Sequence, residues 1–323
     1  MQRPTILCRL LVCMAIAAAM VESPAIADQT PSITFQQQPG KLQISIGGKP
    51  FSTYVYRDEN ILRPYFTNVH APGGIQVTRR HPPRKGIDST DHASMHPGIW
   101  LAFGDISGAD FWRNRAQVEH VEFIEMPRVE NHTGTFEVRN RYRDGEKLIC
   151  EERCRHTISV RDSGYLLVYD STFSNRENLF IFGDQEEMGL GVRVASELRV
   201  TGGNGIILNS DGLKNEQQVR GKQADWCDYS GTINGEHVGM VLLPDPQNFR
   251  RSWYHARNYG FVTANPFGRN ALTGGPKSKV IVKPEESFRL QFGILVYTAN
   301  GKNRVDLKAA YQNFMQQIDR LSK

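Results

Sequence analysis

The chain has 323 residues, 39% of them hydrophobic, and a formal net charge of +5 at pH 7. Its basic residues are spread along the chain without a Lys/Arg block, so nucleic acid is not expected as a partner. After the first 27 residues no apolar run approaches the roughly 18 to 20 residues that a membrane-spanning helix requires, so no membrane span is expected either.

The first 27 residues have the pattern of a secretory signal peptide. Arg3 and Arg9 supply the basic start, residues 10–21 form an apolar run, and the Ala-Ile-Ala sequence at 25–27 fits an A-x-A cleavage site. We therefore expect an exported protein that is periplasmic or secreted. The mature chain would then be one continuous domain, residues 28–323, because no linker or internal repeat interrupts it.

Three cysteines lie beyond the signal segment: Cys150, Cys154 and Cys227. An odd number of cysteines cannot all pair within one chain. Cys150 and Cys154 would be half of a structural metal site only if a second half existed elsewhere in the sequence, and there is none. We expect buried or singly bridged structural cysteines without a redox role, and their pairing stays open.

From residue 41 onward, most segments have the pattern of β-strands. Stretches such as "KLQISIGG", "VEHVEFIEM" and "FRLQFGILVYT" alternate apolar and polar residues, are rich in Val, Ile, Phe and Tyr, and are separated by Gly, Asn, Asp or Pro. Many short strands at close spacing are typical of an antiparallel sandwich or barrel. The sequence predicts an all-β fold, a large antiparallel β-sandwich.

Only the C-terminal segment, residues 304–321, has a convincing helical pattern. Apolar side chains recur there at every third or fourth position, which gives one buried stripe: Leu307, Tyr311, Phe314, Ile318 and Leu321. We expect a closing helix packed on a face of a sheet.

The stretch "DHASMHPGIW" places His92 and His96 four residues apart. Pro97 and Gly98 would stop a helix here, so the spacing alone does not put both imidazoles on one helical face. Two histidines are a weak metal signal, and solvated or capping histidines are an equal alternative. Asp91 could orient a neighbouring imidazole.

The stretch "DQEEMGLGVR" sets two adjacent carboxylates, Glu186 and Glu187, in front of Arg193. Neighbouring side chains point to opposite faces of a strand, so only one of the two glutamates is expected to face a pocket. Arg193 could hold the other in an ion pair. The alternative is a charged turn that leads into an edge strand.

The stretch "SWYHARNYG" alternates Trp253, His255, Arg257 and Tyr259 onto one face if it is extended. Such a row is costly in a core without partners. A polar, aromatic-lined cleft suits it better, because the C–H faces of a sugar stack on Trp and Tyr while its hydroxyls bond to Arg, Asn, Asp and His. A purely structural face is the alternative.

These stretches resemble a family of exported bacterial proteins labelled "methane oxygenase PmoA" or PmoA-like, over residues 62–297. The motifs are similar to R-P-Y-F, D-H-x-x-H-x-G-x-W, E-x-G-x-G-x-R, W-x-D-x-x-G and W-H-x-R-x-Y-G with N-P-F-G. Met95 stands where many members have a further histidine, which disfavours a three-histidine site in this loop. The resemblance implies a role in carbohydrate breakdown and an all-β build similar to the galactose-mutarotase-like supersandwich.

Our first hypothesis is a carbohydrate-active enzyme, an epimerase, lyase or hydrolase, that acts on a sugar or an oxidised glycoside. His96 or His255 would give or take a proton, and Glu187 would be the complementary base. The substrate would be a small molecule or an oligosaccharide. The predicted substrate-binding residues are Arg63, His92, Trp100, Arg193, Asp228, Trp253, Arg257, Tyr259 and Asn265.

Two alternatives stay open. One is a non-catalytic carbohydrate-binding module that uses the same cleft. The other is metal-dependent oxidation, which requires His92, His96, His255 and a carboxylate to converge on a divalent metal. Without that convergence no cofactor or metal is expected. We predict that one cleft is lined by residues from three distant segments: His92, His96, Glu187, Arg193, His255 and Arg257.

Overall fold

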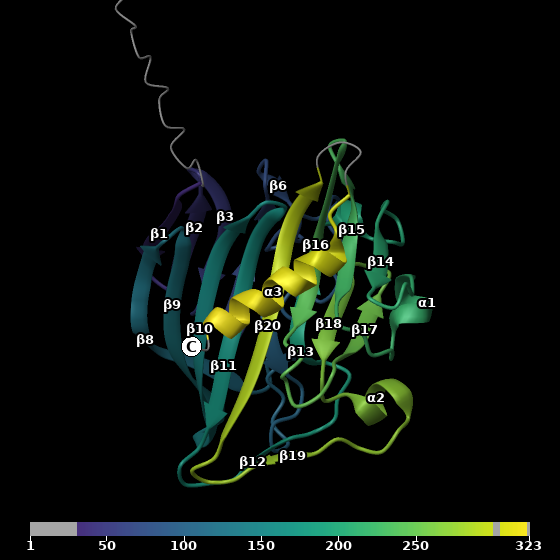
Figure 1. Ribbon diagram of the computed structural model, residues 1–323. Helices are drawn as coiled ribbons and strands as arrows, with labels where there is room; N and C mark the ends of the chain where they lie inside the picture. Colours follow the sequence, from purple (N-terminus) through teal and green to yellow (C-terminus); the bar gives the residue numbers. More distant parts are fainter. Residues whose placement is uncertain (1–30, 300–303, 322–323) are drawn as a thin grey trace, which may run out of the picture. The chain divides into compact units, whose positions relative to one another are not determined.

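Two eight-stranded antiparallel sheets dominate the structure, a computed structural model that describes residues 31–299 and 304–321 (Figure 1). The predicted signal segment, residues 1–27, lies outside the described residues. The described residues fall into one compact unit.

The first sheet, which carries most of the predicted site, has the order β1-β2-β3-β4-β7-β13-β18-β17. Its central strands come from distant parts of the chain and are joined by pairs such as Trp100 with Gly191. Its strands are β1 (Ile33–Gln38), β2 (Lys41–Ile46), β3 (Lys49–Val55), β4 (Tyr65–Thr67), β7 (Ile99–Phe103), β13 (Met188–Arg193), β18 (Phe261–Asn265) and β17 (Trp253–Arg257).

The second sheet has the order β14-β15-β16-β20-β11-β10-β9-β8, and its long hairpins run in sequence order from β8 to β11. Its strands are β8 (Gln117–Glu130), β9 (Thr133–Asp144), β10 (Lys147–Arg161), β11 (Gly164–Ser174), β14 (Ile206–Asn209), β15 (Cys227–Ile233), β16 (Glu236–Pro244) and β20 (Ser287–Ala299). The short elements are β5 (His70–Ala71), β6 (Ile75–Gln76), β12 (Phe180–Phe182), β19 (Val280–Val282), the 3-10 helix η1 (Ser196–Leu198), α1 (Asn215–Val219) and α2 (Arg269–Thr273).

The main core is built from one face of each sheet, as strand alternation requires. In β7, Ile99, Leu101 and Phe103 belong to this core. Trp100 and Ala102, between them, belong to a separate cluster on the opposite face of the first sheet. We call this opposite face the outer face. It is covered by loops instead of by the second sheet.

The C-terminal helix α3 (Leu307–Leu321) crosses the second sheet, as Figure 1 shows. Phe314 and Ile318 are 0% and 3% exposed and pack with residues of that sheet such as Leu166 and Leu295. The predicted amphipathic helix and the all-β sandwich are therefore confirmed. Within the described residues, no helix combines the length and the apolarity that crossing a bilayer would take.

The cysteines Cys150, Cys154 and Cys227 are buried and unbridged. Burial raises the pKa of each thiol well above its usual value. A reactive cysteine needs an accessible thiolate. These three side chains are therefore part of the packing, which agrees with the structural role expected from the sequence.

Candidate functional site

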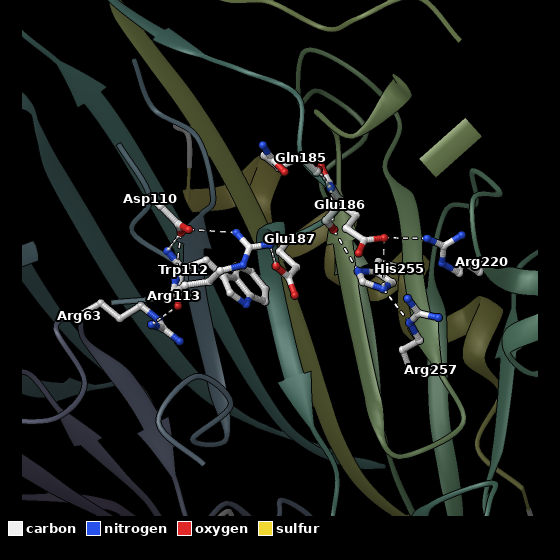
Figure 2. Close-up of polar contacts among 11 residues, drawn as sticks. Arg63, Asp110, Trp112, Arg113, Gln185, Glu186, Glu187, Arg220, His255 and Arg257 are labelled. Carbon is white, nitrogen blue, oxygen red and sulfur yellow. Dashed lines mark hydrogen bonds and ion pairs between the residues drawn. The ribbon is translucent and has the colours of Figure 1, made fainter. Parts of the chain in front are cut away.

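The outer face of the first sheet gathers most of the predicted site residues. In β17, Tyr254 and Ala256 belong to the main core, so Trp253, His255 and Arg257 lie on the outer face. The alternation expected from "SWYHARNYG" is therefore confirmed for these three residues, whereas Tyr259 lies beyond the strand, in the turn that follows it. Figure 2 shows His255 and Arg257 beside residues of the loop that precedes β13.

His255 is held by two different segments. Its Nδ1 atom lies 3.2 Å from the carbonyl oxygen of Glu186, and Arg257 donates its Nε–H to Nε2 of the ring at 2.9 Å. An arginine is always a donor, so Nε2 accepts and the ring proton sits on Nδ1, where it is donated to Glu186. The imidazole is thereby fixed in one neutral tautomer.

The charge state of His255 follows from its burial. Desolvation lowers its pKa to about 4, with Glu186 acting against this and Arg257 reinforcing it. The ring is neutral at pH 7, so it can accept a proton at Nε2, while its one N–H, on Nδ1, is already donated to the carbonyl oxygen of Glu186. Its Nε2 lone pair becomes available only when Arg257 moves aside.

Both Glu186 and Glu187 take part in the outer face, which corrects the expectation that only one would. Strand β13 begins at Met188, so the two glutamates lie in a loop where strand alternation does not apply. Figure 2 shows them projecting to different partners. Glu186 pairs with Arg220, Nη2 to Oε2, at 2.6 Å, and its Oε2 is 3.9 Å from His255 Nε2.

Burial acts to raise the pKa of Glu186, but its interaction with the His255 ring, the hydrogen bond from Arg220 and the charges of Arg220 and Arg257 outweigh burial and leave that pKa below its usual value. Its carboxylate is therefore ionised at neutral pH. Glu186 and the neutral His255 ring form a proton-accepting pair stabilised by two arginines.

Glu187 forms an ion pair with Arg113, which also bonds Asp110 at 3.0 Å from Nη1 to Oδ2. The Glu187 side chain is 15% exposed, whereas that of His255 is 3% exposed. In Figure 2 Glu187 lies between the Asp110–Arg113 pair and the His255 group. Of the three predicted catalytic residues, Glu187 is thus the most accessible to a ligand.

The sequence reasoning missed several members of this ion-pair network. Asp110 and Arg113 belong, with the neighbouring Trp112, to the run "GADFWRN", whose mixture of charged and aromatic residues was a usable signal. Glu216, which accepts from Arg257 Nη1 at 2.9 Å, and Arg220 come from a short helical segment without any distinctive motif. Only the tertiary structure reveals those two.

Asn265 holds the backbone of the loop that carries Glu186 and is fully buried. Its Nδ2 group donates to the carbonyl oxygens of Gln185 and Glu186 at 2.8 and 3.2 Å. Its Oδ1 accepts from the backbone N–H groups of Phe267 and Gly268, both at 2.8 Å. Every hydrogen-bonding group of this side chain is occupied, so its place is behind the site and not against a substrate.

His92 and His96 are the two ends of one hydrogen-bonded turn, which the sequence analysis did not predict. The N–H of His96 donates to the carbonyl of His92 at 2.9 Å, and the two rings stack with centroids 4.9 Å apart. Asp91 Oδ2 lies 2.8 Å from His92 Nδ1, as the predicted orienting carboxylate would. The turn ends before Pro97, so the proline limits it to a single turn.

The His96 ring is stacked on Phe261 at 4.6 Å, and the edge of His255 meets the same Phe261 ring at 5.2 Å. Phe261 therefore stands between the two predicted catalytic histidines. His96 is 1% exposed, and burial lowers its pKa well below the usual value, reinforced by the Arg193 charge. A substrate cannot reach the buried His96 ring in this arrangement. Of the two histidines, His255 is therefore the better candidate for the catalytic residue.

Trp100 and Arg63, both predicted to bind a sugar, are too deeply buried to contact one. Trp100 is 0% exposed and lies under Trp112, so it cannot stack on a ring from solvent. Arg63 is 3% exposed and donates to the carbonyls of Trp112 and Met95 and to Asn114 Oδ1. Burial lowers the pKa of Arg63 to about 9, which still leaves it charged at neutral pH. Both residues fix the loops over the outer face.

Arg193 bonds Asp91, from Nη2 to Oδ1 at 2.8 Å, and not the glutamates as expected. Its guanidinium also lies 4.6 Å from the centre of the Tyr259 ring. Tyr259 stacks with His92 at 5.9 Å. Arg193, Asp91, His92 and Tyr259 form one group beside the His96 turn.

Asp228 is the exception to the common face. It belongs to β15 of the second sheet, between the core residues Cys227 and Tyr229, and so points away from the first sheet. Ser230 Oγ and Tyr297 Oη hydrogen-bond it at 2.7 and 2.9 Å. Burial raises its pKa to about 7. The substrate-binding role predicted for Asp228 is therefore wrong for this site.

A metal centre requires at least three ligands to converge. In the part of the chain that the structure describes, no three His, Cys, Asp or Glu side chains are arranged to hold an ion. His96 is stacked between aromatic rings, and His255 lies beyond Phe261. The ligand set of the metal-dependent hypothesis is not assembled here.

Several solved structures are similar to this chain. A protein described as a kojibiose phosphorylase from human microbiome has 5% identity and a TM-score of 0.39; the match covers 90% of this chain but only 35% of that one, about a third of its length. A galactose mutarotase related enzyme from Lactobacillus acidophilus has 11% identity over 84% of this chain and 100% of its own, with a TM-score of 0.34. A galactose mutarotase-like protein from Lactobacillus casei has 10% identity over 82% and 100%, with a TM-score of 0.33.

These superpositions are partial, so function is inferred from this chain's own residues. No curated protein matches the chain. The PmoA-like label suggested by the sequence finds no support in these comparisons. A family model described as "Family of unknown function (DUF6807)" matches residues 41–311, most of the 323-residue chain, and the protein therefore belongs to that family.

Proposed function

We propose that the outer face of the first sheet binds a carbohydrate and performs acid–base chemistry on it, with Glu187 and His255 as the reacting side chains. One observation carries this proposal: the His255 ring is bonded to the backbone of Glu186, next to Glu187, although β17 and this loop are far apart in sequence. A neutral imidazole and two ion-paired carboxylates therefore meet at this place. Their convergence is typical of a catalytic group.

Glu187 is the group that would contact the substrate. Its ion pair with Arg113 holds the carboxylate in place and leaves the side chain partly exposed. A carboxylate of this kind can remove a proton from a sugar carbon or activate a water molecule. A positioned general acid or base typically contributes about 10² to 10⁴ in rate.

His255 would be the complementary proton acceptor once a substrate hydroxyl or carboxylate draws Arg257 away from Nε2. Arg257 and Arg113 then bind the same substrate from two sides. This arrangement suits an epimerase, a lyase or a hydrolase, and the export expected from the sequence would place the reaction outside the cytoplasm. The carbohydrate-binding module stays as the alternative, because the same groups can bind a sugar without reacting.

The decisive experiment is turnover by the purified mature protein on a panel of oxidised and unoxidised glycosides, with Glu187→Gln and the matched surface control Glu236→Gln. Glu187→Gln keeps the size and polarity of the side chain but removes its charge. We expect it to lower kcat at least 100-fold with little change in binding, while Glu236→Gln matches the wild type.

Three other results would change the proposed function or the residues assigned to it. Sugar binding without turnover by the wild-type protein on the whole panel would favour the binding module. Loss of activity with a chelator, restored by one specific divalent ion, would favour metal-dependent chemistry. Full activity of Glu187→Gln would remove Glu187 from the mechanism.

A further inference from the structure

A separate hollow of about 500 Å³ lies on the outer face of the first sheet, at the side formed by β2, β3 and β4. Its floor includes outward side chains of these three strands, Gln43, Thr53 and Thr67. Its size falls within the range of about 300 to 1,000 Å³ that is typical of small-molecule sites. None of the residues proposed to react lines it.

The one carboxylate in the lining is already compensated. Asp58 Oδ2 accepts from the hydroxyl of Tyr65 at 2.6 Å, and its Oδ1 accepts from the backbone N–H groups of Asn60 and Ile61 at 2.7 and 3.1 Å. Burial acts to raise its pKa, but these hydrogen bonds together lower it. Asp58 is thus a fixed part of the wall.

The cations of the hollow, by contrast, have no carboxylate partner. Lys41 and Arg57 line it, and neither forms an ion pair with any side chain of the described ranges 31–299 and 304–321. At the Glu187 site each arginine is paired instead: Arg113 with Glu187, Arg220 with Glu186 and Arg257 with Glu216. A ligand carboxylate would supply the missing counter-charge at the hollow.

The lining also holds polar atoms that lack a partner among the described residues. The hydroxyl of Thr67, a residue that is 5% exposed, and Nδ1 of His81 are both buried and make no hydrogen bond. Burial lowers the pKa of His81, which therefore stays neutral at pH 7 and can both donate and accept. A buried polar group without a hydrogen-bond partner is unfavourable, so a hydrogen-bonding ligand is favoured.

We propose that this hollow binds an acidic saccharide, a uronic acid or a short chain of uronic acids. The sugar carboxylate would pair with Lys41 and Arg57, and the ring hydroxyls would bond to Thr67, His81 and the amide of Gln43. Sugars suit this lining because hydroxyl, amide and imidazole groups both donate and accept. The site is distinct from the proposed catalytic group, and its occupancy does not depend on turnover.

The test is calorimetric titration of the full mature protein with glucuronic acid and a diuronide, compared with glucose and with inorganic phosphate. We expect the uronides to bind at least 10-fold more tightly than either comparison ligand and to weaken as salt is added, because ion pairs at a partly open site are screened. Equal affinity for glucose or for phosphate would overturn the proposal.

Variants of the lining residues test whether the uronide binds in this hollow. Thr53→Trp fills the hollow and should abolish the titration signal, and the double change Lys41→Gln and Arg57→Gln should weaken uronide binding at least 10-fold. Ser45→Trp, on the same face of β2 but outside the lining, is the matched control and should bind as the wild type does. Unchanged binding by Thr53→Trp would contradict the assignment.

Glu187→Gln separates this proposal from the catalytic one. It should lose turnover but keep uronide binding at the hollow, because Glu187 does not line it. Uronide binding that disappears in Glu187→Gln and persists in Thr53→Trp would place the ligand at the catalytic group and overturn the second site.

Discussion

Arg257 donates its Nε–H to Nε2 of His255 at 2.9 Å, while its Nη1 reaches Glu216, also at 2.9 Å. One guanidinium therefore blocks the only free lone pair of the imidazole and links it to the helix that carries Glu216. Burial lowers the pKa of His255 to about 4, and the Arg257 charge contributes to this shift.

Replacing Arg257 with glutamine should raise the pKa of His255 from about 4 towards its ordinary value of about 6.5, because the positive charge that opposes protonation is removed. Glutamine can still donate one hydrogen bond. The measurement is a pH titration of the histidine ring by NMR. Arg289→Gln, which removes an exposed arginine from the second sheet, is the control. An unchanged His255 pKa would show that burial alone sets it.

The free energy of unfolding should depend on pH through the protonation of the buried histidine His156. Desolvation lowers its pKa to about 3, below the ordinary value of about 6.5 that applies to the unfolded chain. Between these pH values the unfolded state binds the extra proton, so the stability that the neutral ring gives above pH 6.5 is lost as the pH falls towards 3.

His156→Phe should therefore make the free energy of unfolding less steep with pH over this window, by up to about 1.4 kcal/mol per pH unit. Urea unfolding at a series of pH values measures this slope. A pH above 7 serves as the internal reference, because only the packing difference remains there. Identical slopes for the variant and the wild type would contradict the prediction.

Replacing Asn265 with alanine should lower the free energy of unfolding by about 2 to 4 kcal/mol, because two buried N–H groups and two carbonyls lose their partners. Urea unfolding gives the value. Asn313→Ala, on the exposed side of α3, should change it by less than about 0.5 kcal/mol. A loss of the same small size at Asn265 would mean that the loop does not depend on this amide.

Gly191 provides the room for the two tryptophans on the outer face. A Cβ atom at this position would lie 2.7 Å from Trp100 Cε2 and 2.9 Å from Trp112 Cη2. Gly191→Ala should cost about 1 to 3 kcal/mol through overpacking. Trp112→Phe should relieve part of that cost, so a double-mutant cycle should give a coupling energy of at least about 0.5 kcal/mol. Strict additivity would show that the tryptophans do not limit this position.

The sequence predicted the features that depend on local pattern. Alternation identified the strands and the shared face of Trp253, His255 and Arg257, because side chains alternate along any extended chain. The three- and four-residue spacing of apolar side chains identified α3, because residues at this spacing lie on one face of a helix. An odd count and the lack of a second metal half-site predicted buried or singly bridged structural cysteines, and the structure shows all three buried and unbridged.

Only the tertiary structure decided which residues meet. Asp228 matched a motif, yet its strand β15 pairs with β16 in the second sheet. Its neighbours Cys227 and Tyr229 face the main core, so the Asp228 side chain points away from the first sheet. Trp100 and His96 had the right chemistry but lie under covering loops, and burial is a property of neighbours distant in sequence. Arg220 came to Glu186, and Glu216 to Arg257, through long-range packing that no local pattern encodes. Sequence thus determined the kinds of side chain available, and long-range packing determined their partners, their exposure and their charge.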